Sequence, residues 1–347
     1  MICGFVLNMN ISEHIPLAPY TTFKIGGPAR FFCIVKNDAD VIEAVAFAKE
    51  KEIPFFVLGG GSNLLISDDG YTGLVIKIEI GGIVVEEKGN AGLFKVGAGV
   101  DWDQFVGDVV SKGYYGVENL SSIPGVVGAV PVQNIGAYGT DASSVVKNVH
   151  AFDTVAGVFV DISNTDCQFE YRGSFFKKQK GRFIITRVDI ELRKNAVVDA
   201  SYKDLRNYFD EKNIANPTLL QVRDAVIDIR SAKLPDWKKW GTAGSFFKNP
   251  IVSATQFMIL KKAHPDLPGF PEQDGRVKVS LGWILDKVCN AKGLVVGNAG
   301  TYEKQALVLV SKPGATAGEV VSLSRELMKI VKEKTGIEIE AEVEWVN

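Results

Sequence analysis

Two stretches rich in glycine and other small residues most constrain the fold of this chain. The first, at residues 59–63, reads Gly-Gly-Gly-Ser-Asn, and the second, at 119–139, holds many Gly, Pro and small residues without clean hydrophobic periodicity. Because glycine lets the main chain come close to a ligand and adopt positive φ, either stretch can offer backbone N–H groups to an anion. Together they predict two loops that can enclose a long dinucleotide.

The first stretch matches neither of the common phosphate-binding patterns. A Rossmann fingerprint would place spaced glycines where a helix opens after a strand, and a P-loop would end in Lys and Ser or Thr. Here the glycines separate two strand patterns, at 55–58 and 64–66. Taken alone, the run is as compatible with a structural turn as with a ligand loop.

Hydrophobic periodicity predicts an α+β domain around these glycines. A β-prone run at 31–35 precedes Asn37 and Asp38, which can cap a helix. The apolar face of that helix carries Val41, Ile42, Val45 and Ala48. Further elements are expected as short strands at 71–99, a helix at 101–112, and strands at 149–160 and 183–192.

A second unit is expected from about Lys233, after a polar boundary at 193–202. Its last helix is opened by a capping box of Thr316 and Glu319 and closed by Gly336. Residues 337–346 alternate strictly and predict a strand. One face carries Ile337, Ile339, Ala341, Val343 and Trp345, and the other carries Glu338, Glu340, Glu342 and Glu344.

The pentapeptide Gly-Ser-Phe-Phe-Lys occurs twice, at 173–177 and at 244–248. The residues that flank the two copies differ completely. A single shared turn does not make a repeat architecture. We therefore interpret the two copies as a coincidence.

Composition sets the class of protein. With 347 residues, of which 46% are hydrophobic, the chain can build two or three cores. The 39 basic and 41 acidic residues leave a net charge of -2, so no large positive field exists to hold a nucleic acid. A multidomain globular protein without a polynucleotide partner is expected.

Neither a metal site nor a membrane segment is predicted. The cysteines lie far apart and are interpreted as buried small hydrophobes in a reducing compartment: Cys3, Cys33, Cys167 and Cys289. The three histidines, His14, His150 and His264, are isolated. Residues 1–9 lack the basic start of an export signal, and no apolar run approaches about 20 residues. We expect a soluble, cytoplasmic monomer that does not insert into membranes.

A series of short motifs runs through the chain. They are Thr-Phe-Lys-Ile-Gly-Gly at 22–27, the first glycine stretch within 58–65, Gly-Ala-Gly at 97–99, residues 123–139, Tyr-Arg at 171–172, Lys-Leu-Pro at 233–235, residues 244–250, Gln-Ala-Leu-Val at 305–308 and residues 340–343. In this order they resemble the UDP-N-acetylenolpyruvoylglucosamine reductase family, also called UDP-N-acetylmuramate dehydrogenases, in the form with an extra tyrosine loop. The resemblance covers the chain from about Thr21 to Val346.

The resemblance implies a fold and a reaction. The fold is α+β, with a two-part FAD-binding domain of the PCMH/vanillyl-alcohol-oxidase type and a C-terminal α+β substrate domain. Residues 1–70 would form the first FAD-binding subdomain, joined by a C-terminal strand at 337–347; residues 71–230 would form the second, and 231–336 the substrate-binding domain. Noncovalent FAD and NADPH, as hydride donor, would reduce UDP-N-acetyl-3-O-(1-carboxyvinyl)glucosamine to UDP-N-acetylmuramate for peptidoglycan.

By motif position, the resemblance makes Ser245 the proton donor and has Arg172 and Glu342 stabilise and orient an enol-type intermediate. Hydride transfer to the methylene carbon leaves negative charge on the next carbon and its carboxylate, which calls for an acid and a cation. A guanidinium matches a carboxylate bidentately. Each residue has a simpler alternative: a serine in a turn, a surface arginine, and an exposed row of glutamates.

The remaining assignments also follow from the resemblance. FAD contacts are expected at Gly59, Gly60, Gly61, Ser62, Asn63, Ser122, Ile123, Pro124, Gly125, Asn134, Gly136, Ala137, Tyr138 and Arg230. Tyr202 is expected to close over the substrate diphosphate, and Lys233 to meet a phosphate of UDP or NADPH. Asn249 and Gln305 are expected substrate contacts, although either amide could equally cap a turn.

The chain departs from the family pattern at one position, and two alternative functions are considered. Some family members carry Val-Arg where this chain has Val343-Glu344, so a positive charge there is missing or supplied elsewhere. An FAD-dependent sugar or aldonolactone oxidase of the same fold would leave Tyr202, Lys233 and the Ser245 motif unexplained. A noncatalytic nucleotide-sugar binding protein would not need all three candidate catalytic residues.

Overall fold

The computed structural model describes residues 9–272 and 274–347 and divides into two compact units. Unit 1 comprises the chain up to Ile15, Ala29–Gly61 and Thr72–Ala232; unit 2 comprises Pro16–Pro28, Ser62–Tyr71 and Lys233–Asn347. Both units mix helices with strands, and the predicted α+β class is confirmed. Unit 2 resumes at Lys233, where the second unit was expected. The functional division into two FAD-binding subdomains and a substrate domain stays a prediction.

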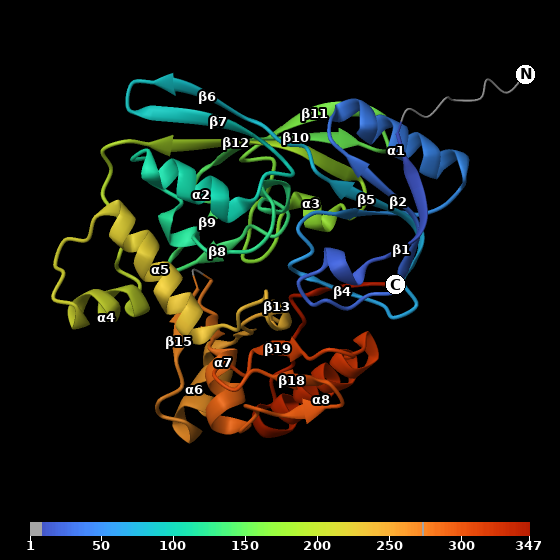
Figure 1. Cartoon of the computed structure of the whole chain (residues 1–347). Coiled ribbons are helices and arrows are strands. Elements are labelled where there is room, and N and C mark those ends of the chain that lie inside the picture. The colour runs from blue at the N-terminus through green and yellow to red at the C-terminus, as the bar shows by residue number, and fades with distance from the viewer. Residues whose placement is uncertain (1–8, 273) are drawn as a thin grey trace, which may run out of the picture. The chain divides into compact units, whose positions relative to one another are not determined.

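Unit 1 contains a four-stranded sheet with one helix packed on it (Figure 1). The sheet order is β1 (Ile11–Pro16), β2 (Pro28–Val35), β5 (Tyr71–Ile78) and β3 (Phe55–Leu58). Helix α1 spans Asp38–Glu50, and Asn37 caps it as predicted, because its side chain accepts the Asp40 N–H at 3.0 Å. Val41, Val45 and Ala48 are buried. The expectation for Ile42 is wrong: it is 47% exposed, since the sheet covers a narrower stripe of the helix.

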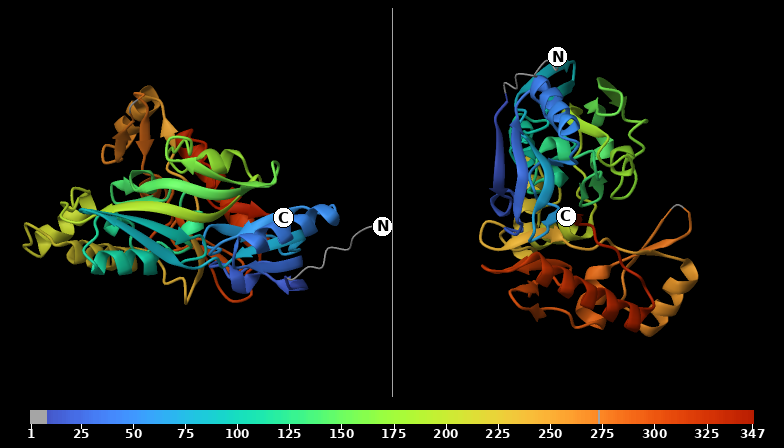
Figure 2. Two further views of the ribbon diagram at one scale, coloured as in Figure 1. Left: turned by 90° about the horizontal axis from the view of Figure 1, so that it is seen from above. Right: turned by 90° about the vertical axis from the view of Figure 1, so that its right-hand side faces the viewer.

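A five-stranded antiparallel sheet forms the larger part of unit 1, and Figure 2 shows its long strands curving together. Its order is β11 (Val158–Ser163), β10 (Val146–Asp153), β12 (Phe183–Arg193), β7 (Ala91–Gly97) and β6 (Ile83–Lys88). The strand pattern predicted at 149–160 corresponds to two strands, because a turn separates β10 from β11. The Asp153 carboxylate accepts the N–H groups of Val155 and Ala156 and closes this turn. The Arg182 guanidinium, which also binds this carboxylate, lowers the pKa of Asp153 to about 2.

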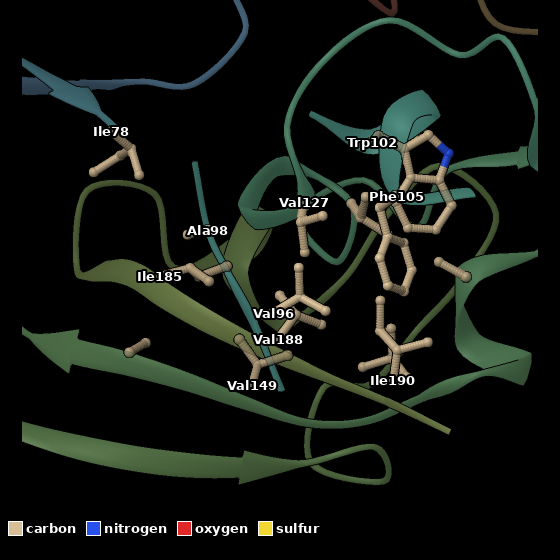
Figure 3. Packing of buried hydrophobic residues seen from close by; sticks show 14 of the residues in the cluster. Ile78, Val96, Ala98, Trp102, Phe105, Val127, Val149, Ile185, Val188 and Ile190 are labelled. Atoms are coloured by element: carbon tan, nitrogen blue, oxygen red, sulfur yellow. The ribbon is translucent and has the colours of Figure 1, made fainter. Parts of the chain in front are cut away.

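Helix α2 (Trp102–Ser111) covers the five-stranded sheet. Figure 3 shows Trp102 and Phe105 together with sheet residues such as Val188 and Ile190. The Trp102 Nε1–H donates to the Leu120 carbonyl at 2.9 Å, so the same residue fixes the core and the start of the second glycine-rich stretch. That stretch contains two short turns of 3-10 helix, η2 (Glu118–Leu120) and η3 (Val127–Ala129), besides the two-residue strand β8 (Gly136–Ala137).

Unit 1 ends in two helices for which the sequence analysis made no prediction. Helix α4 spans Lys203–Glu211 and α5 spans Leu219–Lys233. They share a small core of Leu205, Phe209, Val222, Val226 and Ile229. The minor elements nearby are β8 (Gly136–Ala137), β9 (Thr140–Asp141), η4 (Ala142–Ser144) and α3 (Phe175–Lys178).

Unit 2 is built on one four-stranded and one three-stranded sheet. The first has the order β13 (Gly241–Ser245), β19 (Val308–Ser311), β18 (Ala299–Thr301) and β17 (Val295–Val296). The second has the order β14 (Ile251–Val252), β16 (Val277–Val279) and β15 (Gly269–Pro271). Around them lie η1 (Ala18–Tyr20), α6 (Ala254–Ala263), α7 (Leu281–Trp283) and the π-turn η5 (Ile284–Val288). Helix α8 (Ala317–Thr335) lies beside β18 (Figure 1), and both its predicted capping box and its Gly336 end are confirmed.

The strand predicted over residues 337–346 is wrong for most of its length. Only β20 (Glu344–Val346) is a strand, paired in parallel with β4 (Leu64–Ile66). Residues 340–342 instead bond to the segment after β13, and the isolated bridge there joins Phe247 to Ala341. The change of partner breaks the alternation: Ala341 is exposed and Trp345 is 40% exposed, although both were expected on the apolar face.

The two copies of Gly-Ser-Phe-Phe-Lys adopt different structures. Ser174 caps α3 and donates its hydroxyl hydrogen to the Val132 carbonyl at 2.6 Å. Ser245 ends the strand β13. The shared sequence therefore does not form a repeat, in agreement with its interpretation as a coincidence.

The described cysteines behave as buried hydrophobes. Cys33, Cys167 and Cys289 are buried, and burial raises the pKa of the Cys33 and Cys167 thiols to about 12. Cys3 and the segment tested for an export signal up to residue 8 lie outside the described residues. Across residues 9–272 and 274–347, no helix is long and apolar enough to cross a bilayer.

Adjacent positions on α1 test the packing of unit 1. We expect Val41→Ala to lower the free energy of unfolding by about 2 kcal/mol, because Val41 is fully buried. Ile42→Ala should change it by no more than about 0.5 kcal/mol, since its side chain is largely exposed. Urea unfolding followed by circular dichroism measures both. Equal losses would mean that α1 is rotated from the orientation described.

Candidate active site

The first glycine loop touches the second at Gly60, where the backbone could not tolerate a side chain. A Cβ on Gly60 would lie 2.6 Å from the Gly125 Cα, well inside van der Waals contact. The Gly59 carbonyl accepts a hydrogen bond from Lys77 Nζ at 2.8 Å, and burial lowers the pKa of this lysine. Glycine is therefore required at Gly60 to let two main chains meet, a structural reason that the sequence did not reveal.

The second loop is held by α2 through an ion pair. Asp103 Oδ1 accepts the Ser122 N–H at 2.6 Å and the Arg223 Nη1–H at 2.7 Å. Ser122 has a φ of 60°, in the left-handed region that serine rarely occupies. The carboxylate therefore stabilises the strained residue, and Arg223 on α5 offsets the charge of that carboxylate. Neither Asp103 nor Arg223 carried a local sequence signal.

Three more proposed site residues have left-handed backbones: Asn134 (φ 45°), Tyr138 (φ 47°) and Arg172 (φ 55°). A non-glycine residue in this region costs about 1–3 kcal/mol unless its surroundings hold it, and such strain concentrates at functional sites. Asn134 is held at both ends of its amide, since Oδ1 accepts the Ser143 N–H at 2.9 Å and Nδ2 donates to the Glu170 carbonyl at 3.3 Å. The strain supports a ligand-binding role for this part of unit 1.

Arg172, Tyr138, Tyr202 and Arg230 lie together in unit 1. Arg172 Nη2 donates to the Gly136 carbonyl at 2.9 Å, inside the second loop. Tyr138 packs edge-on against Tyr202, with ring centroids 5.5 Å apart, and hydrogen-bonds the Arg230 side chain. Burial raises the pKa of Tyr138 to about 12, so its phenol remains neutral and able to donate. Four residues predicted from distant parts of the sequence are therefore brought to one place.

This part of unit 1 fits the expected FAD. Burial lowers the pKa of the Arg230 guanidinium, and its Nε is buried without a hydrogen-bond partner among the described residues. A buried cation of this kind is stabilised by an anionic group that brings an acceptor. The donor set suits an anionic dinucleotide.

Ser245 and Glu342 are brought together in unit 2. The Glu342 N–H donates to the Phe246 carbonyl at 2.8 Å, so Glu342 is hydrogen-bonded to the residue that follows Ser245. Asn63, from the end of the first glycine loop, donates from Nδ2 to the Glu342 carbonyl at 3.1 Å. Its own carbonyl accepts the Glu344 N–H at 3.0 Å. Three predicted site residues that are far apart in the sequence therefore lie on bonded segments.

Glu342 differs in burial from Glu338 and Glu340, although Glu344 is half-buried like Glu342. Glu338 and Glu340 are exposed and pair with Lys332 and Lys248 at 2.6 and 3.3 Å. Glu342 is half-buried. The exposed strand face that formed the alternative interpretation therefore describes Glu338 and Glu340 but not Glu342.

The expected substrate contacts in unit 2 have structural bonds. Asn249 Oδ1 accepts the Leu281 N–H at 3.0 Å at the start of α7, and Gln305 Oε1 accepts the Leu307 N–H at 3.3 Å. Both amide oxygens therefore serve the cap or turn role that the sequence left open. Lys233 is exposed at the end of α5. Substrate contacts by these three residues stay predictions.

The predicted residues fall into two sets. Arg172, Tyr138, Tyr202, Arg230 and the loops at 59–61 and 122–137 belong to unit 1, whereas Ser245, Glu342, Asn249, Gln305, Ser62 and Asn63 belong to unit 2. The convergence of Arg172 with Ser245 and Glu342 stays a prediction. Within the described part of the chain, no group of three or more His, Cys, Asp or Glu side chains could hold a metal ion.

Comparison with known proteins covers nearly the whole chain. A family model described as an FAD binding domain matches residues 29–161, and one described as the C-terminal domain of UDP-N-acetylenolpyruvoylglucosamine reductase matches 236–346. The UDP-N-acetylenolpyruvoylglucosamine reductase of Pseudomonas aeruginosa is 41% identical, over 97% of this chain and 99% of its own. That of Neisseria gonorrhoeae is 42% identical, over 95% and 96%. The crystal structure of the Thermus caldophilus UDP-N-acetylenolpyruvylglucosamine reductase superposes with a TM-score of 0.70 at 25% identity, over 98% and 100% of the two chains.

The Asp103 contact predicts a specific loss of FAD affinity. We expect Asp103→Ala to raise the dissociation constant for FAD by roughly 10-fold, about the worth of one charged hydrogen bond, because Ser122 loses its support. Fluorescence titration of the apoprotein with FAD measures it.

Asp153→Ala is the matched control. Asp153 also holds backbone N–H groups and an arginine in unit 1, but at the turn between β10 and β11. The Asp153→Ala variant should have a lower melting temperature than the native protein but an unchanged FAD dissociation constant. Equal weakening by the two variants would show that Asp103 acts only through overall stability.

Proposed function

Because the chain belongs to the UDP-N-acetylenolpyruvoylglucosamine reductase family, we propose that it reduces UDP-N-acetyl-3-O-(1-carboxyvinyl)glucosamine to UDP-N-acetylmuramate, using bound FAD and NADPH. The observation that carries this function is the 41% identity to a curated reductase over 97% of the chain. Identity at this level over both units does not favour the sugar oxidase or the noncatalytic binding protein.

When bound, FAD supplies the chemistry of carrying hydride from NADPH to the sugar. The protein must then manage the charge and the proton. As the methylene carbon of the enolpyruvyl group becomes a methyl group, negative charge spreads over the adjacent carbon and its carboxylate. A group that stabilises this charge only as it forms lowers the barrier.

Arg172 is the cation that we assign to this charge. Its guanidinium is anchored by the Gly136 carbonyl, and its backbone is held in the left-handed region. A planar guanidinium held in this way can meet both oxygens of a carboxylate with little further ordering. The anchoring supports a charge-stabilising role more than that of a mobile surface arginine.

Ser245 is the proton donor that we assign, with Glu342 as the residue that orients the reacting group. An isolated serine hydroxyl is a weak acid, so it needs an organised site to transfer its proton to the carbon. The backbone bonds between 246–248 and 340–342 supply such organisation, since they keep Ser245 and Glu342 on bonded segments.

We place the reaction in the cytoplasm, where NADPH and nucleotide sugars occur, and on the path to peptidoglycan. The lactyl group that the reaction creates ends in a carboxylate, which a later step can join to an amine. Tyr202, Lys233, Asn249 and Gln305 are our candidates for holding the nucleotide sugar. The protein is expected to work as a monomer.

An anaerobic two-step experiment tests the function and the donor. NADPH should bleach the yellow protein, and the enolpyruvyl UDP-sugar should then restore the colour. Ser245→Ala should bleach at nearly the native rate, but its colour should return about 100-fold or more slowly, since a general acid contributes on that scale. Stopped-flow absorbance measures both half-reactions.

Native protein that stays colourless with added FAD, or that is not reoxidised by the sugar, would refute the proposed function. Equal slowing of both half-reactions in Ser245→Ala would make this serine a structural residue. The other serine in the same pentapeptide is no suitable control, because Ser174 is buried and caps α3.

The C-terminal glutamates give a matched pair. We expect Glu342→Gln to slow reoxidation by about 100-fold, because it removes the half-buried carboxylate of a residue whose backbone is bonded to Phe246, the neighbour of Ser245. Glu338→Gln should stay within about twofold of the native rate, since exposed ion pairs contribute little. Stopped-flow measurement of the reoxidation rate distinguishes the two variants. Equal rates would show that Glu342 belongs to an ordinary exposed face.

A further inference from the structure

The strand that carries Ser245 contains a β-bulge immediately before that residue. On β13 and β19, Thr242 pairs with Val310, but Ser245 pairs with Val308. Three steps along β13 are thus matched by two along β19, so one extra residue is inserted between the two pairs. In a strand, a shift of one residue turns a side chain to the opposite face of the sheet. The bulge therefore decides which face Ser245 occupies.

Thr242 holds the bulge with its side chain. Its hydroxyl donates to the Leu309 carbonyl at 2.8 Å and accepts the Gly244 N–H at 3.1 Å. Leu309 is the residue opposite the bulge, and Gly244 lies within it, so the hydroxyl bridges the gap that the extra residue leaves in the ladder. A bulge is otherwise a place where ladder bonds are lost.

The backbone of Thr242 is fixed from its other side. Its N–H donates to the Thr22 carbonyl at 2.9 Å, and its carbonyl accepts the Thr22 hydroxyl at 2.6 Å. Thr242 is 4% exposed. It is therefore buried between β19 and the turn that holds Thr22, with its backbone polar groups and hydroxyl all bonded.

Gly244 is needed for its conformation. Its φ is 72°, and a Cβ built on it would meet no atom within 4 Å. Space is thus available for a side chain, but the left-handed backbone is unfavourable for one. The Thr242 hydroxyl and the Gly244 backbone together form the bulge.

We propose that Thr242 is a positioning residue for the reaction: its hydroxyl holds the bulge that aims Ser245, and so it sets the rate of proton donation without touching the substrate. This inference rests on the proposed role of Ser245. Nothing in the sequence marked Thr242, because a buried threonine in a strand is ordinary.

The test compares half-reactions in the holoenzyme. Thr242→Val keeps the shape of the side chain and removes the hydroxyl. It should slow reoxidation by the enolpyruvyl UDP-sugar by roughly 10- to 100-fold, the scale of a small misplacement of a reacting group, while reduction by NADPH stays within about twofold of the native rate. Thr242→Ser keeps the hydroxyl and should restore reoxidation to within about threefold of native.

Thr301→Val is the matched control. The Thr301 hydroxyl, on β18 of the same sheet, also donates to a carbonyl, that of Ala291 at 2.5 Å, and accepts an N–H, that of Leu294 at 3.0 Å. Thr301 is also 4% exposed. Its loss should destabilise unit 2 to a similar extent in thermal unfolding and leave both half-reactions close to native.

Further results distinguish a failure of this inference from a failure of the proposed function. Thr242→Val combined with Ser245→Ala should be no slower than Ser245→Ala alone, since the two residues act through one group. A slow Ser245→Ala beside a fast Thr242→Val would overturn the positioning role alone, whereas a fast Ser245→Ala would refute the donor assignment. If Thr242→Val does not fold, Gly244→Ala strains the bulge from within, and native-like reoxidation by that variant would also overturn the inference.

Discussion

The pairing of the C-terminal segment is the constraint on which the candidate site in unit 2 depends. Residues 340–342 bond to the segment that follows β13, and Glu344–Val346 then pairs in parallel with Leu64–Ile66. One short segment thus joins the proposed donor strand to the end of the first glycine loop. The segment bends at Val343, between its two partners, and Glu342 lies directly before that bend. Regular pairing along the whole segment would not bring these three pieces together.

Unit 1 holds several candidate site residues in strained backbone conformations. Ser122, Asn134, Tyr138 and Arg172 all have left-handed backbones. Each has a contact that supports it, such as the Asp103 carboxylate on the Ser122 N–H or the two amide bonds of Asn134. The core around α2 (Figure 3) supports this part of the chain, since Trp102 in that core also donates a hydrogen bond to the Leu120 carbonyl at the start of the second glycine-rich stretch. A well-packed sheet and helix thus hold loops that would not adopt these conformations alone.

The two units contribute different chemistry to the proposed reaction. Unit 1 holds the arginines, Arg172 and Arg230, which suit phosphates and a carboxylate. Unit 2 holds the hydroxyl of Ser245 and the carboxylate of Glu342, which suit proton transfer. Such a division fits an enzyme that must bind an anionic cofactor and an anionic sugar and also deliver one proton. The convergence of these groups on one substrate stays a prediction.

The sequence by itself determined the α+β class, the caps of α1 and α8, the glycine loops and, through its motifs, the family. These depend on local rules or on residues that the chemistry demands at set positions, such as Gly60 where two backbones meet. Tertiary structure alone decided that residues 337–343 do not form a strand, that Ile42 is exposed, and that Asp103 and Thr242 support site residues. Alternation along a segment does not reveal which partner it pairs with, and a supporting contact joins residues far apart in the chain. Such features arise only when the packing within each unit brings those segments together.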